Sequence, residues 1–249
     1  MTKTLLGEVV STVAPQCSFD RAAFVLAHMR CGSTALSNIL CSRAEISGYG
    51  EAHIAYRNRS DLGRLVVNQA LRRAWKPGAR YVFDKVLHSR HDRDAPQDFF
   101  RSRAIFLCRR PERAIASIRG LFQSLGREEY TTDSLAADYY VERVGQLCRL
   151  WPLFPSERRL GLTHDALIGA TDDCLARVTA LLQLEPPLLN AYQGHAASVR
   201  GGGGDPLVSA RRTKIEAPRR EKAPEPLALD PGLVQRANEA YERYVEIIA

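Results

Sequence analysis

The sequence predicts an α/β protein in which a central parallel β-sheet is flanked by helices. Short segments that are apolar throughout alternate along the chain with longer segments whose apolar residues recur every three or four positions. Runs of the first kind are typical of parallel strands buried on both faces, and those of the second kind are typical of covering helices. A chain of 249 residues can build one such domain with a sizeable core, so we expect a single domain over residues 1–249.

The first half of the chain is expected to alternate strands and helices. The strands are the continuous apolar runs, and Asp84 and Lys85 are charges inside one of them, which is costly unless they pair or have a function. In chain order we expect a loose or strand-edge arm over 1–20, a strand over 22–27, helices over 33–43 and 61–75, and strands over 80–87 and 104–108.

The second half is expected to be mostly helical. Pro111 suits the first position of a helix, and apolar residues at helical spacing continue to the carboxyl end. Four glycines followed by five prolines among basic residues make the segment 201–232 irregular, either a lid or a solvated linker. The elements are a helix from 111, a helix over 133–151, a strand over 159–163, and helices over 171–184 and 233–248.

Composition and charge narrow the function classes. The net charge of +7 favours anionic partners. The sequence contains no basic run interleaved with aromatic residues, the pattern that would indicate nucleic-acid binding. None of the six cysteines forms a C-x-x-C pair, so we expect reduced thiols and no metal site. No stretch approaches the roughly 18 apolar residues of a membrane span, and the amino terminus lacks a signal-peptide core. These features predict a cytoplasmic protein.

The stretch around residues 24–36 predicts an anion site. An apolar strand ends at His28, a short loop carries Arg30 and Gly32, and a helix begins near Ser33 and Thr34. Helix N-termini attract phosphate or sulfate, and a glycine lets the backbone approach the anion. The alternative is a simple turn with a serine cap. The spacing is not that of an ATP-binding loop, because no lysine precedes the hydroxyl pair.

Cationic side chains follow several of the predicted strands. Arg30, Lys85, His88 and Arg109 all fall at or near the carboxyl ends of strands. Ligands of parallel sheets bind at that edge, so these four side chains are expected to face one crevice.

Together these segments resemble sulfotransferases that use 3'-phosphoadenosine 5'-phosphosulfate (PAPS), and bacterial members of that family in particular. Met29-Arg30-Cys31-Gly32-Ser33-Thr34 resembles the family's P-K-S-G-T-T loop for the 5'-phosphosulfate, with Arg30 in place of the lysine. Arg109 and Ser117, eight residues apart, are similar to the pair that binds the 3'-phosphate. Arg200 and Gly201 begin a segment that resembles the nucleotide-covering R-K-G-x-x-G-D motif.

The resemblance implies the P-loop-like sulfotransferase fold and a transferase that moves a sulfuryl group from PAPS to an acceptor hydroxyl or amine, releasing 3',5'-bisphosphoadenosine (PAP). It also implies that no metal is needed. Glu51, followed by His53, resembles the base of heparan-type members, and His88 resembles the base of cytosolic members. Lys85 is expected to assist the bridging oxygen. Each assignment has an alternative. Glu51 could be a solvated surface carboxylate and His88 a structural histidine, and Lys85 could form an ion pair with Asp84.

Two other functions remain alternatives: a nucleotide-dependent phosphotransferase on the same kind of sheet, and a non-catalytic basic module that binds anionic polymers. Neither a Walker lysine nor an obvious magnesium ligand supports the first. The expected acceptor is a small molecule or a carbohydrate of unspecified identity, with no nucleic-acid partner, and the oligomeric state is left open.

Overall fold

The computed structural model describes residues 3–194, 212–216 and 226–249. Its core is a five-stranded, fully parallel sheet with the strand order β2-β3-β1-β4-β5. The strands are β1 (Ala22–Ala27), β2 (Ile46–Ser47), β3 (Tyr81–Val86), β4 (Arg103–Cys108) and β5 (Arg159–Thr163). The predicted fold class, a central parallel sheet flanked by helices, is confirmed.

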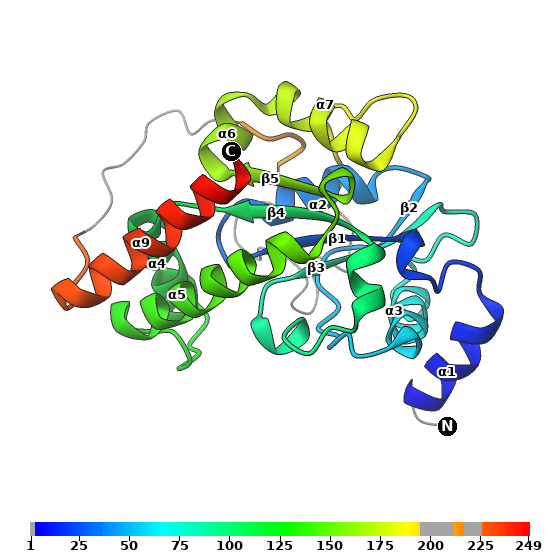
Figure 1. The fold of residues 1–249 in the computed structure, drawn as a ribbon, viewed down its shortest axis with the longest axis horizontal. Helices are drawn as coiled ribbons and strands as arrows, with labels where there is room; N and C mark the ends of the chain where they lie inside the picture. Colours follow the sequence, from blue (N-terminus) through cyan, green and yellow to red (C-terminus); the bar gives the residue numbers. More distant parts are fainter. Residues whose placement is uncertain (1–2, 195–211, 217–225) are drawn as a thin grey trace.

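Helices cover both faces of the sheet. In Figure 1, α5 and α9 run side by side in front of the sheet, and α2 lies behind it. The α-helices are α1 (Lys3–Val13), α2 (Ser33–Cys41), α3 (Arg59–Leu71), α4 (Pro111–Ser124), α5 (Asp133–Leu150), α6 (His164–Gly169), α7 (Thr171–Leu182) and α9 (Pro231–Ile248). No helix in the described ranges is both long and apolar enough to cross a membrane.

The sheet order places two loops next to each other. β1 lies between β3 and β4, and Ala27 at the end of β1 pairs in register with Leu107 near the end of β4. The chain therefore leaves β1 toward one side of the sheet and returns on the other, which creates a crevice at the carboxyl ends of these strands. The loops after β1 and β4, which carry Arg30 and Arg109, meet there.

Apart from small shifts at helix ends, the structure differs from the sequence prediction mainly at three places. The arm expected over 1–20 contains α1, which packs against α3. The two-residue strand β2 and the six-residue helix α6 were not predicted, because they are too short to show a hydrophobic period. α3 begins two residues early because Asn58 and Asp61 form a capping box.

Candidate active site

The loop after β1 has the backbone shape of an anion-binding turn. Arg30 and Gly32 both adopt left-handed backbone angles, with φ of 66° and 90°. Gly32 is the N-cap of α2, so the first helical turn, whose partial positive charge favours an anion, follows directly. The left-handed φ of Gly32 favours glycine, and a Cβ there would also lie in tight contact with His164 Cδ2, at 3.2 Å. Ser33 is the first helical residue rather than the cap, which excludes the simple serine-capped turn.

Hydrogen bonds join Arg30, Ser117 and Arg109 in one cluster. Arg30 Nε donates to Ser117 Oγ at 2.9 Å, and Arg109 Nη1 donates to the Arg30 carbonyl oxygen at 3.2 Å. Ser117 lies on α4, two turns after the loop that carries Arg109. The three residues that resemble the phosphate contacts of the nucleotide therefore lie together, although 87 positions separate Arg30 from Ser117.

Arg109 contains a buried donor that the described residues leave unsatisfied. Its Nε is inaccessible to solvent and has no hydrogen-bond partner among them. Burial lowers the pKa of the Arg109 guanidinium, and the charges of Arg113 and Arg30 act in the same direction. A half-buried cation among other cations is costly unless an anion compensates it. The cluster is therefore suited to an anionic ligand.

Lys85 brings a further cation to this loop from the neighbouring strand. The residue is 2% exposed, and its Nζ donates to Thr34 Oγ1 at 3.2 Å. Asp84 instead holds the loop that carries Glu51, since its oxygens accept from Ala52 N at 2.8 Å and Tyr56 OH at 2.6 Å. Burial raises the pKa of Asp84 to about 7. Adjacent strand residues point to opposite faces, so these two side chains serve different partners rather than each other.

Both base candidates are in a form that accepts a proton at neutral pH. Burial would raise the pKa of the 6% exposed Glu51 carboxyl, but the His53 imidazole and the Lys85 charge hold it below its ordinary value. His53 Nδ1 lies 3.1 Å from Glu51 Oε1. Burial lowers the pKa of His88 to about 4, and the charges of Arg90 and Arg143 add to this effect. These shifts leave Glu51 ionised and His88 neutral, so they do not choose between the two.

Three buried polar residues that the sequence did not single out hold the site in shape. His28 is fully buried, its Nδ1 donates to the Met29 carbonyl at 2.7 Å, and its Nε2 accepts from Arg109 N at 2.9 Å. Tyr139 OH accepts from Met29 N at 2.9 Å and donates to the Leu87 carbonyl at 2.7 Å. The loops after β1, β3 and β4 are thereby joined side to side.

Arg143, one helical turn after Tyr139 on α5, completes this frame. Its Nε donates to the carbonyl of Ala27 at 2.9 Å and its Nη2 donates to that of Val86 at 2.9 Å, at the ends of β1 and β3. Its Nη1 lies 2.8 Å from Asp92 Oδ2, and both side chains are fully buried. An arginine on the apolar face of a predicted helix was the available sequence signal, since a buried charge needs a partner.

Acid is expected to destabilise the protein through His28. Burial lowers the pKa of His28 to about 3, whereas in the unfolded chain it is near 6.5. Between these values the unfolded state binds the proton and the native state does not, so stability falls as the pH falls. We expect His28→Gln to be less stable than the wild type at pH 7.5, and the gap to narrow by about 1.4 kcal/mol at pH 5.5. Urea unfolding at the two pH values measures this, and a constant gap would contradict it.

His164 is a further residue that only the structure brings to the site. It begins α6 after β5, and its ring lies against Gly32 of the anion loop. Burial lowers the pKa of His164 to about 4, and the Arg109 charge acts in the same direction. It is therefore neutral at pH 7 and offers a hydrogen bond rather than a charge to a ligand in this loop. The short helix α6 gave no periodic signal in the sequence.

The remaining candidates from the sequence are placed as follows. Cys31 is fully buried and burial raises the pKa of its thiol, so it can offer a ligand only its backbone. Arg200 and Gly201 lie outside the described residues. Most of the segment 201–232 is outside them too, but Ile215 is buried and exchanges two hydrogen bonds with Asn190. The choice between lid and linker stays open.

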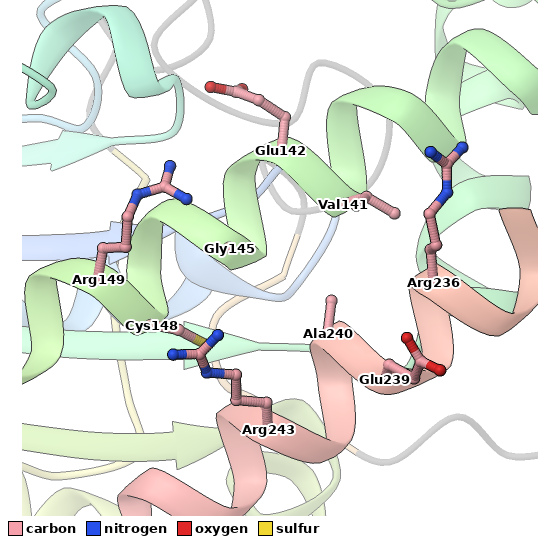
Figure 2. Close-up of a pocket in the computed structure, with 9 residues that line it drawn as sticks. All are labelled: Val141, Glu142, Gly145, Cys148, Arg149, Arg236, Glu239, Ala240 and Arg243. Atoms are coloured by element: carbon pink, nitrogen blue, oxygen red, sulfur yellow. The ribbon is translucent and has the colours of Figure 1, made fainter.

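Two surface hollows lie away from this cluster. One, of about 510 Å³, is a groove between α5 and α9 whose rim carries Arg149, Arg236 and Arg243 together with Glu142 and Glu239 (Figure 2). The other, of about 520 Å³, surrounds Tyr81 at the amino ends of the strands. Neither is lined by a residue of the anion loop or by a base candidate.

Comparisons with known proteins support the fold. No protein-family model matches the sequence, and no curated protein matches it. Among solved structures, the sulfotransferase domain from the curacin biosynthetic pathway is 16% identical with a TM-score of 0.57, covering 89% of this chain and 97% of that one. The sulfotransferase domain of a Synechococcus olefin synthase is 16% identical with a TM-score of 0.53, covering 91% and 92%. A sulfotransferase from Alicyclobacillus acidocaldarius is 12% identical with a TM-score of 0.51, covering 91% and 93%. The chain therefore has the fold of the sulfotransferases.

Proposed function

We propose that this chain is a cytoplasmic, bacterial-type sulfotransferase that moves the sulfuryl group of PAPS to a hydroxyl or amine of a small-molecule or carbohydrate acceptor. The observation that carries the proposal is the buried Arg109 Nε without a partner among the described residues, beside the Arg30–Ser117 hydrogen bond. These groups come from the two loops that flank the crevice and from α4, and they carry the sequence patterns that resemble the donor-binding motifs.

The proposed donor site divides between two phosphate groups. The backbone amides after Gly32, with Arg30, Thr34 and Lys85, surround the position for the 5'-phosphosulfate at the start of α2. Arg109 and Ser117 are assigned to the 3'-phosphate, which would give Arg109 Nε the acceptor that it lacks. A guanidinium with a phosphate forms charge-assisted hydrogen bonds, which are among the stronger polar contacts in proteins.

Sulfuryl transfer needs positioning and charge stabilisation more than covalent help from the protein. The acceptor oxygen attacks sulfur in line with the leaving phosphate oxygen, and negative charge develops on that oxygen as the bond to sulfur breaks. Arg30, Lys85 and the amides of α2 stabilise this charge in the proposed mechanism. The acceptor's proton passes to Glu51, which Lys85 and His53 keep ionised. His88 is the alternative base.

Arg109→Ala is expected to weaken PAP binding roughly 10- to 150-fold, because the loss of a charged hydrogen bond costs about 1.5–3 kcal/mol. Calorimetric titration with PAP, without added metal, measures it. Arg110→Ala is the matched control: Arg110 is the adjacent arginine, its side chain is 56% exposed, and it pairs with Asp165. It should leave PAP affinity unchanged.

The same titration separates the competing functions. Equal PAP affinity in wild type and Arg109→Ala would refute the assignment of the 3'-phosphate. Binding of ATP only with Mg²⁺, and no binding of PAP, would favour the phosphotransferase. Binding of an anionic polysaccharide that nucleotide does not affect, without any nucleotide binding, would favour a basic binding module.

A further inference from the structure

Two loops at the edge of the crevice bring a carboxylate and two imidazoles together. Glu51 and His53 lie in the loop after β2, and His91 ends the 3₁₀-helix Ser89–His91 after β3. The hydrogen bond from Tyr56 N to the His91 carbonyl, at 2.9 Å, fastens these loops to each other. One nitrogen or oxygen atom from each of the three side chains lies within 4.8 Å of the others.

The Glu51 carboxylate is the group that points to a ligand. Its Oε1 is buried and accepts no hydrogen bond of good geometry from the described residues, although His53 Nδ1 is only 3.1 Å away. Two acceptor atoms at that distance repel each other unless a proton or a cation lies between them. His53 is the exposed member of the group and Glu51 and His91 are buried, so the cluster opens to solvent on one side.

The donor set selects a class of ion. Two imidazoles and one carboxylate are ligands that Zn²⁺ and similar first-row divalent ions prefer, and catalytic zinc sites use the same combination. Mg²⁺ and Ca²⁺ prefer sets made of oxygen atoms. Arg90 Nε donates to His91 Nε2 at 3.3 Å, so on metal binding this bond breaks or the other ring nitrogen becomes the ligand.

We propose that Glu51, His53 and His91 form a binding site for Zn²⁺ or a similar divalent transition metal. Where the ion is bound, it occupies the carboxylate oxygen that would accept the acceptor's proton, and sulfuryl transfer stops. The ion is then a reversible inhibitor and not a participant in the reaction. The binding site stands on the geometry alone, whereas the inhibition also rests on the proposed function.

Binding is tested with Co²⁺ and Zn²⁺ on the intact protein without nucleotide. We expect one ion per chain, visible Co²⁺ absorption without the near-ultraviolet band of a cobalt thiolate, and displacement by Zn²⁺. His91→Ala and His53→Ala should each weaken binding at least 10-fold, since even outer-shell partners of metal sites contribute 10- to 100-fold. His164→Asn, which changes a histidine outside the cluster, should leave the affinity for the metal unaltered. A thiolate band, or binding that neither cluster variant weakens, would overturn the site.

Inhibition is tested in a transfer assay with labelled PAPS. In the wild type, Zn²⁺ should abolish transfer with a midpoint equal to its dissociation constant, and a chelator should restore it. PAP affinity should change far less than the transfer rate, because none of the three metal ligands is among the groups assigned to the phosphates of the donor. In His91→Ala, with the rate expressed relative to that variant's own rate without metal, the Zn²⁺ concentration at the midpoint of inhibition should be at least 10-fold higher. Full transfer at saturating Zn²⁺ would overturn the inhibition, whereas metal binding by a protein that does not bind PAP would overturn the proposed function and keep the site.

Discussion

Glu51→Gln is expected to lower kcat for an aliphatic alcohol acceptor about 10²- to 10⁴-fold, the usual contribution of a positioned general base, while PAP affinity stays the same. Glutamine keeps the size of the side chain but cannot take a proton. The carboxylate is 6% exposed and its pKa is held below its ordinary value, so in the native enzyme it is ready to accept one. Initial rates of transfer from labelled PAPS, with PAP titration in parallel, measure both effects.

The acidity of the acceptor sharpens this test. A phenol whose own pKa lies near the assay pH is already partly ionised and needs a base less than an alcohol does. The loss in Glu51→Gln should therefore shrink along a series from aliphatic alcohols to acidic phenols. Glu128→Gln, a change at an exposed carboxylate, controls for the loss of one negative charge. A loss of equal size for every acceptor would indicate a structural role for Glu51.

His88→Asn separates the two base candidates. If Glu51 is the base, His88→Asn should keep most of the rate with the aliphatic alcohol. The fractional loss that this variant causes should then be the same for every acceptor in the series. If Glu51→Gln is fully active and His88→Asn shows the graded loss instead, the role belongs to His88. Its 5.4 Å ring contact with Tyr139 would then place the base directly against the frame of the site.

Arg143→Met is expected to cost about 3–5 kcal/mol of unfolding free energy, because it leaves a buried carboxylate without its partner. Arg143 and Asp92 are both fully buried and are joined at 2.8 Å. The change also removes the donors to the carbonyls of Ala27 and Val86, at the ends of the two strands that carry the anion loop and Lys85. PAP affinity should therefore fall along with stability. Urea unfolding and PAP titration measure the two effects.

A matched pair on the surface provides the control. Arg93 and Glu142 are joined at the same 2.8 Å, but their side chains are 61% and 45% exposed. Arg93→Met should cost no more than about 1 kcal/mol, as exposed ion pairs do. Since the cost in Arg143→Met is large against a typical total stability of about 5–15 kcal/mol, the double variant Arg143→Met/Asp92→Asn is the second measurement. It should be more stable than the sum of the single changes implies, and strict additivity would contradict the pairing.

Local pattern was sufficient for most of the fold. The apolar strands β1, β3, β4 and β5 were predicted to within one residue, because buried parallel strands are continuous hydrophobic runs. The helices that cover the sheet were found from their apolar period, with ends misplaced by up to four residues where caps decided them. The elements that were missed are α1, β2 and α6, and each either packs or pairs against a segment that is distant in the chain or is itself too short to show a period.

The site divides in the same way. The sequence by itself determined a short, glycine-containing loop before a helix, and it placed Arg30, Lys85 and Arg109 at or near strand ends, since these features depend on residues close together in the chain. Only the tertiary structure decided that Arg30 bonds to Ser117, that Glu51 lies with His53 and His91, and that His28, Tyr139 and Arg143 fasten the three loops. The physical reason is that a buried polar group must find its partner in space, and the order of strands in the sheet determines which distant residue supplies it.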